Sequence, residues 1–198
     1  MYLEQANQLL STGYLSLETG YTRLPNGDML VGVLTRMPKC KGKMVDWWFG
    51  YVGDTEKYKL WHPHDHLIGE WDGYWRPGHY VGASHLVHEY IGKEIVKLKI
   101  TFREPSDFLD ISRFEESRVG AVVCGDVDLL EEDAHLGHLM HFVRDTDFGC
   151  EMRSRFWLHG GQEAMARDLM HHCIEEMGNL SDLLPGLYAE EAKPRSPK

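Results

Sequence analysis

Residues 160–186 read GGQEAMARDLMHHCIEEMGNLSDLLPG, and this stretch decides the fold. Two glycines precede an apolar pattern of helical period, and Pro185-Gly186 follows it. Such residues are typical of helix boundaries, so the sequence predicts a helix from about Gln162 to about Leu184. It is the one long helix that the sequence predicts.

The phase of this helix separates two adjacent His/Glu pairs. At about 100° per residue, one stripe is apolar and contains Met165, Leu169, Cys173, Met177 and Leu180. Glu176 falls inside this stripe and His172 at its edge, whereas His171 and Glu175 fall on the polar side. A carboxylate among apolar side chains needs a compensating partner. We therefore expect His172 and Glu176 to face the interior, with His171 in solvent.

Extended segments precede the helix. After a short helix within residues 2–10, Pro25-Asn26-Gly27-Asp28 is a turn signal, and Asp145 to Gly149 marks a hairpin. The predicted strands are Met29–Thr35, His85–Ile91, Val96–Phe102, Val119–Val127, Leu136–Arg144 and Glu151–Leu158. Strands followed by a terminal helix favour an α+β fold in which the helix lies across a curved antiparallel sheet and encloses a cavity.

Composition limits the classes of function. A chain of 198 residues corresponds to one domain with short appendages, which we expect at 1–20 and 189–198 around a domain at 21–188. A net charge of −10 without a basic tract argues against nucleic acid and anionic membranes. No signal peptide, membrane span or CxxC pair is recognised, so we expect a cytoplasmic protein with reduced cysteines. A homodimer is compatible with the sequence.

The segment Tyr58-Lys59-Leu60-Trp61-His62-Pro63-His64-Asp65-His66 holds three imidazoles and a carboxylate within five residues. Imidazole is the commonest ligand for borderline divalent metals. We expect a strand to end at Pro63, which would aim the cluster at a cavity. A solvated histidine-rich turn is the alternative, and this segment alone does not decide between them.

Two predicted strands carry polar residues among apolar ones. Glu89 shares a face with Val87 and Ile91, and His141 shares one with Leu139 and Val143. Together with the histidine-rich segment and the helical His/Glu pair, they suit a zinc ion in an open coordination sphere, and non-haem iron also fits.

Two further groups have structural interpretations. Residues 44–51 carry four aromatics within five positions, and we expect a Trp of the Trp47-Trp48 pair to line a pocket while the other packs in the core. Arg153 and Arg155 alternate along a strand, and we expect solvated ion-pair partners rather than catalysts.

Several motifs resemble the diacetylphloroglucinol hydrolase family, which includes phloretin hydrolase. The resemblance extends from about Gly20 to Tyr188 and is carried by residues 44–49, 58–66, 153–157 and 172–176 and by Glu89. It implies a helix-grip fold like that of START domains and the birch-pollen allergen. It also implies zinc-dependent hydrolysis of a carbon–carbon bond between an acyl group and a phenolic ring.

The resemblance also assigns residues. The positions that match metal ligands are His66, Glu89, His141, His172 and Glu176. Tyr58 matches a tyrosine that contacts a phenolic hydroxyl. As a separate mechanistic hypothesis, we expect His62, Asp65 or Glu176 to shuttle a proton, and the sequence does not distinguish among the three. Gly69 and Phe156 depart from the family, because an asparagine and a tyrosine are expected there.

Two other functions therefore stay open. One is a metal-dependent lyase, cyclase or dehydratase acting on an aromatic polyketide. The other is a helix-grip domain that binds a small ligand without chemistry.

Overall fold

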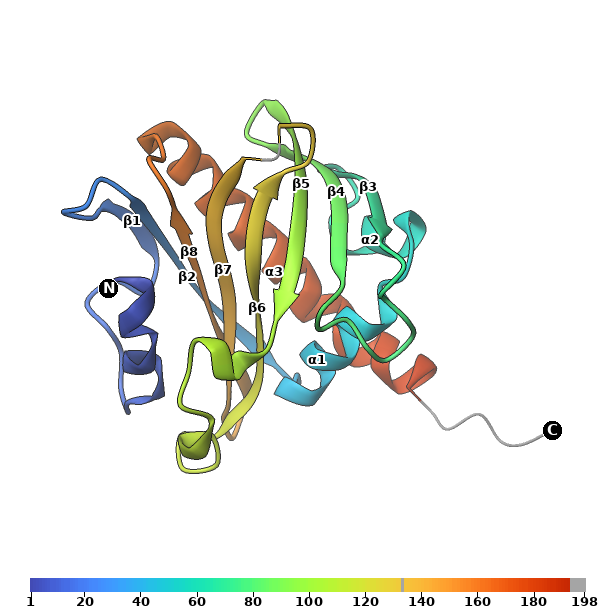
Figure 1. The fold of residues 1–198 in the computed structure, drawn as a ribbon. Coiled ribbons are helices and arrows are strands. Elements are labelled where there is room, and N and C mark those ends of the chain that lie inside the picture. Colours follow the sequence, from blue (N-terminus) through green and yellow to red (C-terminus); the bar gives the residue numbers. More distant parts are fainter. Residues whose placement is uncertain (133, 193–198) are drawn as a thin grey trace.

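A computed structural model describes residues 1–132 and 134–192. Eight antiparallel strands form one sheet in the order β1-β2-β8-β7-β6-β5-β4-β3 (Figure 1). The strands are β1 (Gly20–Arg23), β2 (Met29–Pro38), β3 (His66–Trp71), β4 (Ser84–Ile91), β5 (Glu94–Arg103), β6 (Val119–Leu129), β7 (His135–Asp145) and β8 (Gly149–Leu158). The helices are η1 (Leu3–Leu10), α1 (Gly42–Tyr51), α2 (Thr55–Trp61), η2 (Pro105–Asp107), η3 (Ile111–Arg113) and α3 (Glu163–Glu191). The six strands predicted between Met29 and Leu158 are all present.

Helix α3 crosses one face of the curved sheet, which makes the fold a helix-grip, as expected (Figure 1). The main core fills the space between them, and the buried side of α3 includes Cys173, Met177 and Leu180. A second core cluster lies where η1 packs against the opposite, outer face of the sheet. Strands β2, β6, β7 and β8 therefore bury residues on both of their faces.

Helix α3 does not end near Leu184, as the sequence suggested, but continues through Pro185 to Glu191. Proline lacks the N–H that would bond to the carbonyl four residues earlier, which is that of Ser181. The Cys40 thiol lies 3.6 Å from this carbonyl oxygen and donates to it. The freed acceptor is thus satisfied from outside the helix, and the proline is tolerated.

The expectation that a strand precedes the histidines is wrong, because Thr55–Trp61 is helix α2. Asp54 caps it by accepting a hydrogen bond from the N–H of Lys57 at 2.9 Å. Tyr58 and Trp61, three residues apart, share its buried face. Pro63 then separates this helix from β3, which begins at His66.

The aromatic segment forms helix α1, and neither tryptophan lines the cavity described below. Trp48 is fully buried, and Trp47 stacks on Tyr51 with ring centroids 4.5 Å apart. Phe49 lines the cavity instead. The pocket expectation for the tryptophans was therefore wrong, because the helical period turns Phe49 toward the sheet.

Arg153 and Arg155 are ion-pair partners, as expected, but they are buried rather than solvated. Both contact Glu18 in the segment that precedes β1. That segment covers the outer face of β8 and so removes both guanidinium groups from water.

Three other expectations concern the whole chain. None of the helices within the described ranges is long and apolar enough to cross a membrane. All four cysteines are buried and free. The division at 1–20, 21–188 and 189–198 stays a prediction, and residues 193–198 of the expected tail lie outside the described residues.

Candidate metal centre

A cavity of about 170 Å³ lies between α3 and the inner face of the sheet. Its walls are mainly aliphatic and aromatic side chains from β4 to β8 and α3. Most of the polar side chains gather at one end and are Tyr58, His85, Glu89, His141, His172 and Glu176, and the lining also includes His138 and His159. An apolar chamber with a few convergent polar groups is the usual form of a small-molecule site.

The polar end is organised around His66, the first residue of β3, which is completely buried. Its Nε2 atom lies 3.3 Å from Glu176 Oε1 and 3.8 Å from Glu89 Oε2. His66, His172 and Glu176 offer ligand atoms that all lie within 4.8 Å of one another. Residues from β3, β4 and α3 therefore meet at one point.

Hydrogen bonds fix which nitrogen of each histidine faces this point. The Nδ1–H of His66 donates to the carbonyl of Tyr58 at 2.9 Å, because a carbonyl can only accept. The Nδ1 of His172 lies 3.2 Å from a carboxylate oxygen of Asp65, which also accepts. Both Nε2 atoms are left unprotonated in the neutral form, and they are buried without a hydrogen-bond partner among residues 1–132 and 134–192. Two orphaned lone pairs beside two carboxylates fit a divalent cation.

The electrostatics of the cluster favour the ligand forms of its members. Burial would raise the pKa of Glu176, but His66, His172 and His141 outweigh it and lower that pKa, so the carboxylate stays ionised. Burial lowers the pKa of His141 to about 4, which keeps its imidazole neutral. Burial lowers the pKa of His172 less than Glu176, Glu89 and Asp65 raise it, so a proton competes with a metal there.

Tyr58 connects the cluster to the cavity. Its hydroxyl donates a hydrogen bond to Glu89, and its ring stacks on His66 with centroids 3.7 Å apart. Burial, together with Glu89 and Glu176, raises the pKa of Tyr58 well above its usual value. The phenol therefore remains protonated and is suited to orient a ligand rather than to act as a base.

The three candidates for proton transfer lie in different places. Glu176 lines the cavity, whereas His62 and Asp65 are absent from its lining. The imidazole of His62 stacks behind that of His172, with centroids 5.2 Å apart. Its Nδ1 accepts the N–H of Asp65 at 3.2 Å, so its Nε2 carries the proton and has no lone pair for a metal. Both residues contact His172 on the side away from the cavity.

His85 is a cavity residue that sequence reasoning missed. It lines the cavity from β4, and its ring stacks on Trp71 with centroids 4.3 Å apart. Its buried Nε2 has no hydrogen-bond partner in the part of the chain that the structure describes. Burial lowers its pKa to about 3, so the ring is neutral at physiological pH. The signal was present in the sequence, since His85 stands four residues before Glu89 and alternation places both on one face.

The two departures from the expected family pattern have clear structural settings. Phe156 is a wall of the cavity and lies edge-on to His141, with centroids 5.8 Å apart. Gly69 lies in β3 directly under the ring of Tyr58, and a Cβ atom there would stand 2.6 Å from Tyr58 Cγ. The tyrosine ring thus occupies the space that an asparagine side chain would need.

Gly69→Ala is expected to displace Tyr58 and to destabilise the fold by about 1–3 kcal/mol through overpacking. Metal affinity should fall as well, because Tyr58 stacks on His66. Gly178→Ala is the matched control, since nothing lies within 4 Å of its Cβ position in α3 and helix propensity favours alanine there. Urea unfolding of both variants measures the difference, and equal midpoints would contradict the packing argument.

Together, the sheet, the helix and the buried His/Glu cluster define a helix-grip protein with an internal cavity of the kind that holds small molecules. Solved structures share the fold. Major latex-like protein 151 of Panax ginseng matches with a TM-score of 0.56 and 11% identity, over 79% of this chain and 97% of that chain. Ara h 8.0201 matches with a TM-score of 0.55 and 8% identity, over 80% of this chain and 99% of that chain. At such identities the likeness shows the fold alone.

The chain belongs to the DAPG hydrolase PhiG domain family, whose model matches residues 1–163. A phloretin hydrolase of Eubacterium ramulus is 30% identical in an alignment of 204 positions that covers 87% of this chain and 72% of that protein. A 2,4-diacetylphloroglucinol hydrolase of a Pseudomonas species is 24% identical in an alignment of 229 positions that covers 97% of this chain and 78% of that protein. The family model ends before His172 and Glu176, so their assignment depends on the geometry described above.

Proposed function

We propose that this protein is a metal-dependent hydrolase that cleaves the carbon–carbon bond between an acyl group and a phenolic ring. The observation that carries the proposal is the pair of orphaned Nε2 atoms of His66 and His172, buried beside Glu176 at the end of an apolar cavity. Membership of the family supports the reaction class, because two relatives are named as hydrolases of phloretin and of 2,4-diacetylphloroglucinol.

The metal would be held by the five residues that the sequence indicated. These are His66, Glu89, His141, His172 and Glu176. Zinc is favoured over iron(II), since imidazole and carboxylate ligands with an open position suit a catalytic zinc ion. When bound, the metal would supply Lewis-acid activation of water or of an acyl oxygen. Asp65 would act as a positioning residue, because its carboxylate holds the Nδ1–H of His172.

The reaction adds the elements of water across the aryl–acyl bond. The acyl carbon gains the hydroxyl, the ring carbon gains the proton, and the products are a carboxylic acid and the deacylated phenol. Tyr58 would accept a hydrogen bond from a phenolic hydroxyl, because its own hydrogen is committed to Glu89. Of the candidate proton carriers, Glu176 is the one that lines the cavity, so we assign the transfer from water to the ring carbon to it.

The cavity favours a small substrate. A void of about 150 Å³ accommodates benzene, so about 170 Å³ suits a single substituted ring. Phe156 replaces a polar wall with an apolar one, whereas the neutral His85 adds a nitrogen that could contact a ring hydroxyl. We therefore expect the pattern of preferred ring hydroxyls to differ from that of the relatives, with monocyclic acylphenols preferred.

The proposal is tested by incubating the protein with mono- and diacylphloroglucinols. We expect one equivalent of carboxylic acid for each acylphenol consumed, loss of the activity after treatment with a chelator, and recovery on addition of Zn²⁺. Chromatography with a standard of the deacylated ring measures both products. Consumption of substrate without release of acid would instead indicate a lyase, cyclase or dehydratase, and binding without turnover would indicate a ligand carrier.

A further inference from the structure

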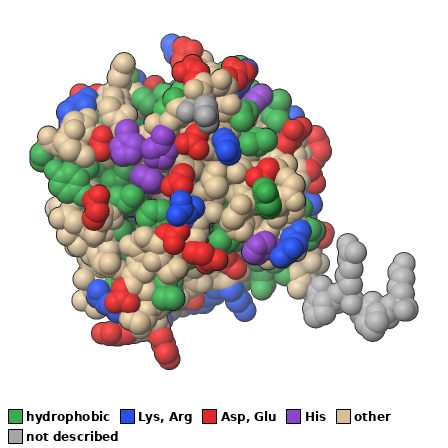
Figure 2. Space-filling model, viewed as in Figure 1, with side chains coloured by type: hydrophobic (Ala, Val, Ile, Leu, Met, Phe, Trp, Pro, Cys, Tyr) green, Lys and Arg blue, Asp and Glu red, His purple; other side chains and the backbone are tan. Residues whose placement is uncertain are grey.

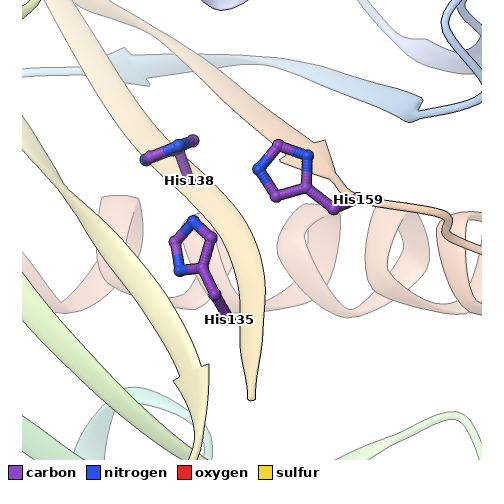
Figure 3. A group of neighbouring side chains, drawn as sticks. All are labelled: His135, His138 and His159. Carbon is purple, nitrogen blue, oxygen red and sulfur yellow. The ribbon is translucent and has the colours of Figure 1, made fainter.

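Three histidines form a separate group at the rim of the cavity. His135 is the first residue of β7, His138 lies three residues further along the same strand, and His159 directly follows β8 (Figure 3). Each offers a ring nitrogen, and the three nitrogens lie within 4.8 Å of one another. Figure 3 shows the three rings close together beside the ends of β7 and β8, and Figure 2 shows histidine side chains gathered at the surface. His138 and His159 also line the cavity, so the group stands where the cavity meets the surface.

Each of these imidazoles is held by a carboxylate through the same nitrogen. The Nδ1 atoms of His135 and His138 lie 2.8 Å from Asp128 and 2.9 Å from Asp126. The Nδ1 of His159 lies 3.3 Å from Asp28. Because a carboxylate accepts, each Nδ1 carries the hydrogen, and each Nε2 keeps its lone pair when the ring is neutral. A carboxylate behind each histidine is the arrangement that orients imidazole ligands around metals.

Two of the three carboxylates are themselves fixed. Asp126 accepts a hydrogen bond from Arg103 Nη1 at 2.9 Å. Asp28 accepts from the N–H of Gly160 at 3.2 Å and from the side-chain amide of Asn26 at 2.6 Å. The three carboxylates and one guanidinium leave the group with an excess of negative charge when the imidazoles are neutral. A divalent cation would find both the ligands and the charge that it requires.

We propose that His135, His138 and His159 bind a second divalent metal ion of the zinc class, with water in the remaining position. Three imidazoles with three carboxylates behind them suit Zn²⁺, Co²⁺ or Ni²⁺ better than Mg²⁺ or Ca²⁺, which prefer oxygen ligands. The site shares no residue with the inner cluster. The ion joins the start of β7, the β8–α3 connection and, through Asp28, the turn before β2.

The position gives the ion a structural role at the entrance of the cavity. Leu136 and Leu158, neighbours in sequence of His135 and His159, line the cavity. Binding would hold these two segments together, since a metal that binds only the folded state stabilises it. The same histidines would act as three separate His–Asp pairs if no ion bound, and that alternative predicts no metal uptake here.

The test is a titration of metal-free protein with Co²⁺, whose visible spectrum reports coordination by nitrogen, and then with Zn²⁺. The inner site is removed with His172→Ala and the rim site with the double variant His135→Gln/His159→Gln. We expect the natural protein to bind two equivalents of metal, and His172→Ala and the double variant to bind one equivalent each. The triple variant, which combines all three substitutions, should bind none. His171→Gln, a change at an exposed histidine of α3, is the control and should retain two.

The result that overturns the proposal is an equal metal content in the natural protein and the double variant. It would leave the inner site and the proposed hydrolase untouched, because the two sites are removed by different substitutions. Asp128→Asn provides a milder test, since this carboxylate contacts His135 alone among the three histidines. It should weaken the rim site by about 10–100-fold without loss of the ligands, and unchanged affinity would contradict the role assigned to the carboxylates behind the histidines.

Discussion

His172→Ala should lose the inner metal ion and reduce hydrolysis by about 10³-fold, whereas His171→Ala should retain both. The two residues are adjacent in α3, but His172 is buried with its Nε2 orphaned and His171 is exposed. A bound metal is worth several kcal/mol to the transition state, and about 4 kcal/mol corresponds to the stated factor. Metal analysis after gel filtration and the rate of acid release measure the two effects.

Asp65→Asn provides the intermediate case. An amide oxygen can still accept from the Nδ1–H of His172, but it carries no charge to strengthen the imidazole as a ligand. Metal affinity should fall by about 10–100-fold, with activity recovering at high Zn²⁺ concentration. Equal metal retention in His171→Ala and His172→Ala would show that α3 presents a different face to the cavity than the structure indicates.

The sheet and the last helix could be predicted because their patterns depend on burial alone. Alternation in β4 and β7 places Glu89 and His141 on the inner face, as expected. The phase of α3 correctly separates His172 and Glu176 from His171 and Glu175. A single apolar stripe or face determines each of these results, and such patterns are local in sequence.

The remaining errors arose where distant residues decide the local structure. The thiol of Cys40 satisfies the carbonyl that Pro185 frees, and this contact spans 141 residues. Arg153 and Arg155 are buried because Glu18 and its neighbours cover them. No pattern within β8 or α3 contains this information.

The sequence predicted which residues form the candidate site, but it did not predict how their ring nitrogens are oriented and hydrogen-bonded. The sequence could not distinguish which nitrogen of a histidine faces the cluster, because that depends on the carbonyl of Tyr58 and the carboxylate of Asp65. For the same reason His62 and Asp65 were grouped with Glu176 as proton carriers. Both residues contact His172, and we propose that they position it.

The second large effect is expected from Glu18, which lies far from the metal cluster. Its carboxylate oxygens lie 2.5 Å from Arg153 and 2.5 Å from Arg155, and both guanidinium groups are almost completely buried. Removing one partner of a buried ion pair leaves an uncompensated charge, which typically costs about 3–5 kcal/mol. Glu18→Gln should therefore lower the free energy of unfolding by about this amount, as measured by urea denaturation at neutral pH.

Asp147→Asn is the matched control, because Asp147 pairs with Arg118 at 3.0 Å on the surface and is almost fully exposed. Such pairs contribute about 0–1 kcal/mol.

The pH dependence gives a second check. Burial alone would raise the pKa of Glu18, but the combined effect of Arg153, Arg155 and the N–H of Leu15 is larger and lowers it. The folded pKa therefore lies below the unfolded one. The stability that Glu18 contributes is then fully present above the unfolded pKa and is lost as the pH falls through the folded pKa. The free energies of unfolding of the natural protein and of Glu18→Gln should therefore converge in acid. A difference between them that is constant with pH would show that the charge of the Glu18 carboxylate is not what stabilises the fold here.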